Sequence, residues 1–216
     1  KVVVTNKESI ESKTLILACG ATPKKLGIEG EQLLTGKGVS YCATCDGPFY
    51  RDQEVAVVGG GDTAMEEALF LTRFARKVTV VHRRDALRAT KILQERAFKN
   101  DKIEFIWDTV IEKIEGEKAV ERVTLKNVKT GEILARKTAG VLIFVGTKPN
   151  TQFLQGTVDL DEQGFILTDN NLESSNPGIF ASGDARKKLL RQVSTAVGEG
   201  ATAAFAAEKY LERVHS

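Results

Sequence analysis

The sequence has few of the residues that build metal sites or disulfide frameworks, and it has no membrane-length apolar run. Its 216 residues include two histidines, three cysteines, four prolines and one tryptophan. Gly, Lys or Asp interrupts every apolar stretch before it reaches the ~18 residues of a membrane helix, so we expect no membrane association. The formal charge is only +2, from 31 basic and 29 acidic residues. No global electric field therefore favours binding to nucleic acid or to an anionic membrane.

What remains is the composition of an ordinary soluble globular protein. Hydrophobic residues make up 42% and charged residues 28% of the chain, which is enough for a sizeable core. The chain opens with Lys1 rather than Met, and no signal-peptide pattern follows. We therefore expect an internal start and a fragment of a longer polypeptide. The odd number of cysteines, with Cys42 and Cys45 close together, favours a reducing compartment, the cytoplasm, over a secreted disulfide scaffold.

A strand–helix–strand pattern occupies the middle of the chain. Residues 54–58 and 78–81 are short continuous apolar runs, typical of parallel strands that are covered on both faces. Between them, alanine and leucine recur at helical spacing over residues 64–75, and Asp62 or Thr63 is placed to cap the helix. The sequence therefore predicts a complete βαβ unit with a right-handed crossover.

The pattern changes after this unit. Residues 103–137 indicate short alternating strands with a hairpin turn at 129–132, and residues 141–145 return to a buried strand. We interpret residues 103–137 as a β-meander inserted into a nucleotide-binding domain. Outside this domain the sequence predicts three further strands and a long alanine-rich helix, at residues 14–18, 165–167, 179–181 and 193–214.

A glycine-rich motif connects the first strand of the βαβ unit to its helix. Gly59-Gly60-Gly61-Asp62-Thr63-Ala64 matches G-x-G-x-x-A in the context that is typical of dinucleotide binding. Gly59 permits the tight turn, Gly61 lets the backbone approach a pyrophosphate, and Ala64 lets helix and strand pack closely. The phosphates would lie at the helix N-terminus, where free N–H groups favour anions. The competing interpretation is a glycine-rich turn before an ordinary helix.

The second strand of the unit ends in the basic segment His82-Arg83-Arg84-Asp85-Ala86-Leu87-Arg88. An NAD site has an acidic residue at this strand end to bind the ribose 2′-hydroxyl, whereas guanidinium groups suit a 2′-phosphate. A solvated basic turn is the alternative, but the position at the strand end favours contact with the cofactor. We therefore expect NADPH, bound with the help of His82, Arg83, Arg84 and Arg88.

Cys42-Ala43-Thr44-Cys45 is a C-x-x-C motif. Residues three apart on a helical turn have Cβ atoms about 5 to 6 Å apart, so the two sulfurs can form a redox disulfide. Asp46 follows directly and is either a proton relay or a turn former before Gly47. A zinc half-site is the alternative, but the sequence has no second C-x-x-C and no paired histidines. We expect Cys19 to be a buried small hydrophobe without chemistry.

Four segments, in this order and spacing, resemble the low-molecular-weight thioredoxin reductases along essentially the whole chain. They are residues 38–47 around the dithiol, the glycine motif, residues 82–89, and Gly183-Asp184 with Arg191-Gln192. The resemblance implies an α/β flavoenzyme with two Rossmann-like nucleotide-binding domains of the glutathione-reductase type and a β-meander insertion. It also implies a homodimer that passes electrons from NADPH through FAD and the dithiol to thioredoxin.

The same resemblance assigns roles to individual residues. Cys45 would lie nearer the flavin, Cys42 would attack the thioredoxin disulfide, and Asp46 would supply the proton. The arginines of the basic segment match the family's 2′-phosphate cluster. Cys19 stands where the family usually has Thr, which puts one side-chain contact in doubt. The residues implied in flavin binding are Gly20, Gly183, Asp184, Arg191, Gln192 and Val193.

The chain contains one glycine fingerprint, whereas the family carries an additional one near its N-terminus for the FAD pyrophosphate. We therefore expect the N-terminal part of the FAD domain to be missing. Residues 1–23 and 147–216 would be the remaining parts of that domain, with exposed strand edges and apolar surface. They would flank a complete NADPH domain at residues 24–146. The segments 22–24 and 146–149 are either interdomain hinges or ordinary turns.

Three other functions remain open at this point. A flavoprotein disulfide reductase of a peroxiredoxin system resembles the same family but has acidic or neutral residues where Arg83 and Arg84 stand. A ferredoxin or quinone reductase of the same fold lacks the dithiol. A non-catalytic NADPH-binding fragment would hold the nucleotide without capturing FAD, and the visible spectrum of the purified chain would identify it.

Overall fold

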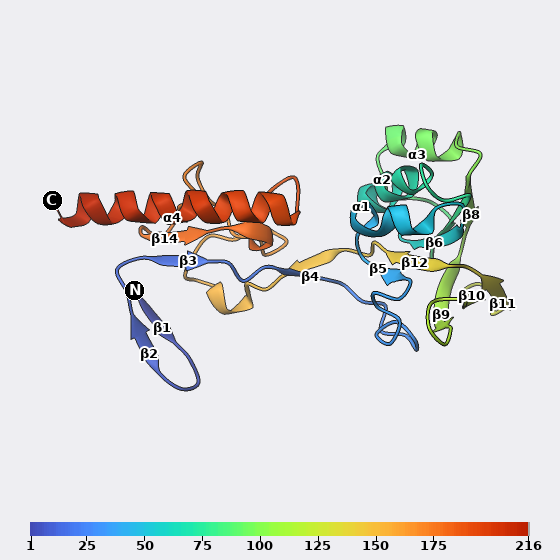
Figure 1. The fold of residues 1–216 in the computed structure, drawn as a ribbon, viewed down its shortest axis with the longest axis horizontal. Helices are drawn as coiled ribbons and strands as arrows, with labels where there is room; N and C mark the ends of the chain where they lie inside the picture. Colours follow the sequence, from blue (N-terminus) through green and yellow to red (C-terminus); the bar gives the residue numbers. More distant parts are fainter. Residues whose placement is uncertain (216) are drawn as a thin grey trace. The chain divides into compact units, whose positions relative to one another are not determined.

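The computed structural model describes residues 1–215, which form two compact units (Figure 1). One unit comprises residues 23–146, and the other comprises residues 1–22 together with the chain from residue 147 onward. The polypeptide therefore passes between the units twice, after Thr22 and after Gly146. No helix within residues 1–215 is both long enough and apolar enough to cross a membrane.

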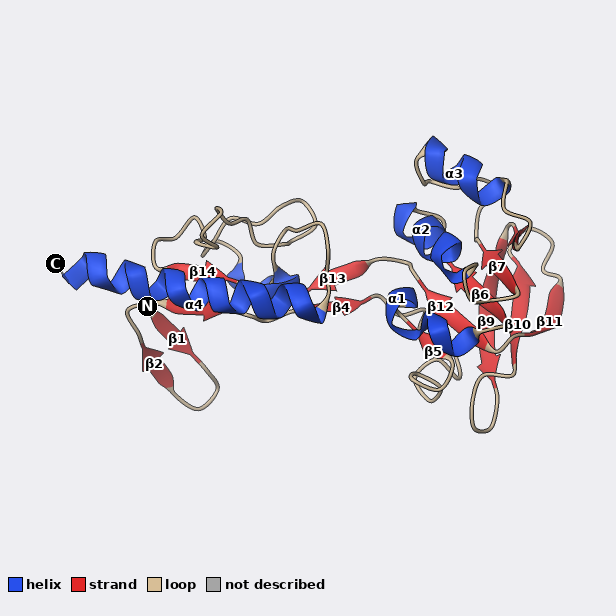
Figure 2. Cartoon of the chain, turned by 45° about the horizontal axis from the view of Figure 1, so that its top comes forward, coloured by secondary structure: helices blue, strands red, loops and turns tan. Residues whose placement is uncertain are grey.

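The unit of residues 23–146 is built on a five-stranded parallel sheet (Figure 2). Its strands, in the order β5-β12-β6-β7-β8, are β5 (Val39–Ser40), β12 (Gly140–Ile143), β6 (Glu54–Val58), β7 (Lys77–Val81) and β8 (Ile103–Ile106). Val55 lies opposite Val78 in the register between β6 and β7. Both of these strands are buried over all but their first residue, as expected for strands covered on both faces.

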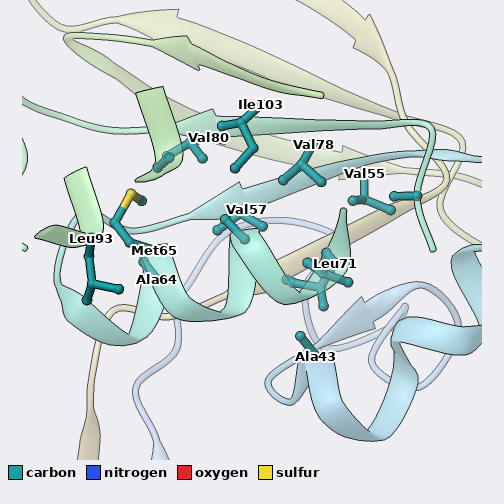
Figure 3. Close-up of a cluster of buried hydrophobic side chains, with 14 of the residues drawn as sticks. Ala43, Val55, Val57, Ala64, Met65, Leu71, Val78, Val80, Leu93 and Ile103 are labelled. Atoms are coloured by element: carbon teal, nitrogen blue, oxygen red, sulfur yellow. The ribbon is translucent and has the colours of Figure 1, made fainter. Parts of the chain in front are cut away.

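Helices cover one face of this sheet and an antiparallel meander covers the other. The helices are α1 (Ala43–Asp46), the 3₁₀ turn η1 (Gly47–Tyr50), α2 (Asp62–Leu71) and α3 (Lys91–Phe98), and the meander strands are β9 (Thr109–Glu115), β10 (Arg122–Asn127) and β11 (Ile133–Lys137). Successive residues of a strand point to opposite faces. Val55 and Val57 therefore pack with the helices in the core shown in Figure 3, whereas Ala56 and Val58 pack on the meander side.

The structure confirms the predicted βαβ unit and the hairpin turn at residues 129–132, but it corrects the start of the meander. Residues 103–106 form β8, which pairs in parallel with β7 and belongs to the central sheet. The antiparallel strands begin only at Thr109. Because β8 is an edge strand and is only partly buried, it lacks the continuous apolar run by which the central strands are recognised. The strand predicted at 141–145 ends at Ile143.

The prediction that Asp62 or Thr63 caps α2 is wrong. Gly61 occupies the N-cap position and provides no side-chain cap. Asp62 is the first residue of the helix, and its Oδ1 accepts a 2.6 Å hydrogen bond from the backbone N–H of Thr90. The carboxylate therefore links the glycine motif to the start of α3, a contact between segments that are 28 residues apart.

The other unit combines a two-stranded parallel sheet with a long helix. β3 (Leu15–Leu17) pairs with β14 (Ile179–Ala181), and Phe180 packs against Ala203 and Ala207 of α4 (Val193–His215). The shorter elements are β1 (Val2–Val4), β2 (Ser9–Glu11), β13 (Thr147–Pro149), η2 (Gln152–Leu154) and η3 (Gly183–Ala185). β4 (Ala21–Pro23) ends at the boundary between the units, since Pro23 belongs to the unit of residues 23–146. The strand predicted at 165–167 is absent from the described residues as a regular element. Ile166 is buried in the core, which explains the apolar pattern, but its backbone forms only isolated bridges.

Candidate active site

Four loops, among them those with the dithiol, the glycine motif and the basic segment, begin at the same edge of the parallel sheet. Cys42 follows the short strand β5, Gly59 follows β6, His82 follows β7 and Phe144 follows β12. The carboxyl ends of parallel strands lie at one edge, which is where ligands bind in open α/β sheets. The fold therefore brings the predicted dithiol and the predicted nucleotide-binding motif to the same edge.

Cys42 and Cys45 form a disulfide, with their Cα atoms 5.3 Å apart. Cys42 is the N-cap of α1, and its Sγ accepts a 3.1 Å hydrogen bond from the backbone N–H of Cys45. Cys45 is exposed, whereas Cys42 is half-buried. An N–H group directed at a sulfur stabilises the thiolate that forms on reduction. This geometry therefore suits a redox-active pair.

The redox turn, residues 42–46, is seated against α2. Ala43 is fully buried in the helix-side core (Figure 3). Burial raises the pKa of Glu67 on α2, and hydrogen bonds from the backbone N–H groups of Ala43 and Thr44 only partly oppose that rise. Burial and the nearby charge of Asp46 raise the pKa of Tyr50 to about 12. Two carboxyl groups, those of Asp46 and Glu67, thus lie at the redox turn.

The glycines of the motif have different steric surroundings. A Cβ atom on Gly59 would come within 2.5 Å of the Phe144 carbonyl oxygen and 2.7 Å of the Ala64 Cβ, so the protein itself requires glycine there. A Cβ atom on Gly61 would meet no protein atom within 4 Å. Open space therefore remains at the N-terminus of α2, where a pyrophosphate can reach the free N–H groups. The motif fits a dinucleotide.

A cavity of about 860 Å³ adjoins the glycine motif. Arg83 and Arg88 line it, whereas Arg84 is exposed but lies outside the lining. Within residues 1–215, no carboxylate forms an ion pair with these three guanidinium groups. Their charges are therefore available to an anionic ligand such as a 2′-phosphate.

His82, the first residue of the basic segment, is buried directly after β7, against Gly60 of the glycine motif. Its Nε2 lies 3.1 Å from the carbonyl oxygen of Ala86. Burial lowers the pKa of His82, and the charges of the neighbouring arginines lower it further, whereas the Ala86 carbonyl opposes the shift. The imidazole is therefore neutral at pH 7 and supports the loop without adding a charge.

The basic segment is also held by Lys129, a residue that sequence reasoning did not identify. The Lys129 Nζ lies 3.0 Å from carboxylate oxygens of both Asp85 and Asp108. Its hydrogen bond and charge lower the pKa of Asp85. Lys129 comes from the hairpin between β10 and β11, so no local pattern could have shown that it reaches this segment.

In the other unit, the predicted flavin-binding residues follow the paired strands β3 and β14. Gly20 and Gly183 adopt the left-handed region, with φ of +68° and +73°. Oδ1 of Asp184 is buried and has no hydrogen-bond partner among the residues that the structure describes. An unsatisfied buried acceptor is costly unless a ligand supplies a donor. The hydroxyl groups of a ribityl chain are such donors, so Asp184 fits a flavin.

The predicted stretch at residues 191–193 leads into α4. The Arg191 guanidinium lies 4.0 Å from the centroid of the Phe165 ring. The backbone N–H of Gln192 donates to Thr195 Oγ1, and Val193, the first residue of α4, is exposed. Cys19 is half-buried beside the core of this unit, and burial raises the pKa of its thiol.

Glu199 of α4 is a second candidate that sequence reasoning missed. Its Oε2 accepts a 2.8 Å hydrogen bond from the Gly183 N–H, and its Oε1 pairs with Arg186 at 2.8 Å and Lys188 at 3.0 Å. Burial pushes the pKa of Glu199 upward, but these partners outweigh it and hold the pKa below the ordinary value. The only sign in the sequence is a lone acid between two glycines of an alanine-rich helix.

Comparison with known proteins confirms the resemblance seen in the motifs. Residues 1–200 match the pyridine nucleotide-disulphide oxidoreductase family. The chain is 52% identical to the thioredoxin reductases of Peptoclostridium litorale and Peptoclostridium acidaminophilum, over 99% and 98% of this chain and 70% and 69% of those proteins. The crystal structure of thioredoxin reductase from Streptococcus pyogenes MGAS5005 superposes with a TM-score of 0.94 at 53% identity, covering 98% of this chain and 70% of that one. The chain belongs to the thioredoxin reductases, within the pyridine nucleotide-disulphide oxidoreductase family.

Proposed function

We propose that residues 24–146 are the NADPH-binding domain of a thioredoxin-disulfide reductase and that residues 1–23 and 147–216 belong to its FAD-binding domain. Membership of the family implies the use of a flavin and a pyridine nucleotide. The observation that carries the finer proposal is the position of the Cys42–Cys45 disulfide and the glycine motif at one edge of one sheet. Electrons would pass from NADPH through FAD to this disulfide and then to thioredoxin.

The residues around the cavity support NADPH as the nucleotide. Bound NADPH supplies a hydride, and bound FAD relays its electrons. Gly61 would let the pyrophosphate approach the N-terminus of α2, and Arg83 and Arg88 would bind the 2′-phosphate. The neutral His82 would fix the position of the basic segment relative to the glycine motif. Asp62 and Thr63, in the first turn of α2, would lie near the pyrophosphate.

Asp184 is the residue whose surroundings best support FAD. Its orphaned Oδ1 would accept a hydrogen bond from the ribityl chain, and Glu199 would hold the preceding Gly183 in place. Gly20, Arg191, Gln192 and Val193 would complete the contacts from this chain.

The reduced dithiol would transfer two electrons in two exchanges. One thiolate attacks a sulfur of the thioredoxin disulfide, which breaks that S–S bond and forms a mixed disulfide. The other thiolate then attacks the sulfur of its partner cysteine in the mixed disulfide. This attack re-forms the Cys42–Cys45 disulfide and releases reduced thioredoxin. Asp46, within the redox turn, would protonate the departing thiolate; its alternative role is that of a turn former.

The proposal is tested by comparing NADPH with NADH as electron donor for the reduction of thioredoxin by the intact flavoprotein. Preference for NADPH is the expected result. Strong preference for NADH would favour a reductase of a peroxiredoxin system instead. A colourless protein that binds NADPH but reduces no disulfide would identify a non-catalytic nucleotide-binding fragment. Location in the cytoplasm and a homodimeric state are further parts of the proposal, and sedimentation of the intact protein tests the latter.

A further inference from the structure

Glu31 is a buried carboxylate whose surroundings the proposed mechanism does not explain. It is 2% exposed, and it forms no ion pair among residues 1–215. Instead, three neutral donors converge on it. Oε1 accepts from the backbone N–H of Leu26 at 3.0 Å and from the Tyr41 hydroxyl at 2.7 Å, and Oε2 accepts from the Gly27 N–H at 2.7 Å. A buried carboxylate is tolerated only where such donors replace its water.

Tyr41 connects Glu31 to the redox turn, because Cys42 is the next residue. Burial, the hydrogen bond to Glu31 and the charge of Glu31 raise the pKa of Tyr41 to about 12. The hydroxyl therefore stays protonated and remains a donor throughout the physiological range. The Ser40 Oγ, on the other side of Tyr41, accepts the Cys42 N–H at 3.1 Å. The backbone that enters the dithiol is thus anchored on both sides of Tyr41.

Leu26 and Gly27 connect Glu31 to the nucleotide cavity. The lining of that cavity includes Lys25, Leu26, Ile28 and Glu29. This segment is distant from the glycine motif in the sequence, but both line the same cavity. The far end of this segment is attached to β9, because the Ile114 N–H donates to the Glu29 carbonyl at 2.9 Å. Its near end is attached through the Lys24 N–H, which donates to the Gly146 carbonyl at 2.9 Å, and through the bonds of Leu26 and Gly27 to Glu31.

We propose that Glu31 is a positioning residue that holds the dithiol and one wall of the nucleotide cavity in a common arrangement. The proposal rests on the proposed function, because it assumes that the cavity holds NADPH and that the disulfide is redox-active. One carboxylate makes both attachments, so its loss should disturb both sites together. Loss of the Tyr41 hydroxyl should disturb the dithiol alone.

Two substitutions separate these effects. In Glu31→Gln, the amide oxygen replaces only one carboxylate oxygen and is uncharged, so the bonds that it keeps are weaker. The NH₂ group opposes the donors of the other oxygen. Tyr41→Phe removes the hydrogen bond between Glu31 and the residue that precedes the redox turn. The bonds from Leu26 and Gly27 to Glu31 remain. Leu93→Ala is the control, because Leu93 of α3 is buried in the helix-side core, which neither Leu26 nor Tyr41 contacts, so its loss should lower stability without disturbing either attachment.

The two readouts are the dissociation constant of NADP⁺, measured by calorimetry, and the equilibrium constant for reduction of the disulfide by glutathione. For Glu31→Gln we expect the dissociation constant to rise about fivefold or more, the effect of losing an ordinary hydrogen bond. Both Glu31→Gln and Tyr41→Phe should make the disulfide easier to reduce by a similar factor, because a looser turn brings the two thiols together less often. Tyr41→Phe should leave NADP⁺ binding unchanged.

The proposal is overturned if both variants merely lower the melting temperature, as Leu93→Ala is expected to do, with neither readout changed. If Glu31→Gln does not fold, Tyr41→Phe alone decides: an unchanged glutathione equilibrium contradicts the positioning role. Failure of the proposed function looks different, because the unsubstituted protein itself would then not bind NADP⁺ or would not have a reducible disulfide.

Discussion

Gly60 lies directly against the imidazole of His82. A Cβ atom on Gly60 would come within 2.3 Å of the ring carbon Cε1 and 2.5 Å of Nδ1. The Gly60 carbonyl also accepts the backbone N–H groups of Arg88 at 2.7 Å and Ala89 at 3.1 Å. One residue of the glycine motif thus contacts both ends of the basic segment, at His82 and at Arg88.

We predict that Gly60→Ala and Gly61→Ala will have different effects. At Gly60 the new methyl group must displace the buried His82, so we expect a loss of stability of about 1–3 kcal/mol together with weaker NADP⁺ binding. At Gly61 the methyl group meets no protein atom, so stability should be unchanged while NADP⁺ binding falls. Thermal unfolding and calorimetric titration of both variants provide the measurement. Equal loss of stability in the two variants would contradict this interpretation.

The arginines should contribute unequally to cofactor choice. Arg83 and Arg88 line the cavity, and Arg84 does not. Replacement of Arg83 or Arg88 by Gln should weaken binding of 2′,5′-ADP by about tenfold or more, since each can lose a charge-assisted hydrogen bond. Binding of 5′-AMP, which has no 2′-phosphate, should change little. Arg84→Gln is the matched control, and a larger effect at Arg84 than at Arg88 would show that the cavity lining does not identify the phosphate site.

Stability should decline in weak acid because of His82. The pKa of His82 is lowered in the folded protein, so as the pH falls below about 6.5 the unfolded chain takes up the proton first. The stability that the neutral imidazole contributes is therefore present above the unfolded pKa and is lost as the pH falls through the folded pKa. Urea unfolding between pH 5 and 8 measures the slope, and His82→Gln should flatten it. An identical slope in that variant would assign the effect to other groups.

Asp184→Asn should reduce flavin retention. The change affects a buried acceptor, Oδ1, that has no hydrogen-bond partner among the described residues, so it should cost the flavin-free protein little stability. It should weaken the contact with a ribityl hydroxyl, because a hydrogen bond to a charged acceptor contributes about 1.5–3 kcal/mol. The ratio of flavin to protein absorbance after purification is the measurement. A full complement of flavin in the variant would exclude Asp184 from the site.

The cysteines should separate flavin reduction from disulfide reduction. Cys45→Ser should abolish reduction of thioredoxin while NADPH still bleaches the flavin, because the block lies after the flavin. Loss of both activities would count against the order of transfer. Single-cysteine variants mixed with a thioredoxin that lacks its resolving cysteine will identify the attacking sulfur. The family resemblance assigns this role to Cys42, whereas the greater exposure of Cys45 favours the opposite assignment.

The sequence by itself determined the features that are local. Strands β6 and β7 are visible as continuous apolar runs, because they are buried on both faces. Helices α2 and α4 are visible because burial of one stripe repeats apolar residues at helical spacing. The glycine motif and the C-x-x-C motif were equally visible, because their chemistry depends on residues only a few positions apart.

Only the tertiary structure decided which distant residues meet. Asp62 reaches Thr90 instead of capping α2, and Lys129 holds Asp85 from a hairpin of the meander. Glu31 binds Tyr41, and the edge strand β8 joins the parallel sheet. A side-chain hydrogen bond or a strand pairing of this kind leaves no period in the sequence, because its partner is selected by the path of the whole chain and by the burial that this path creates.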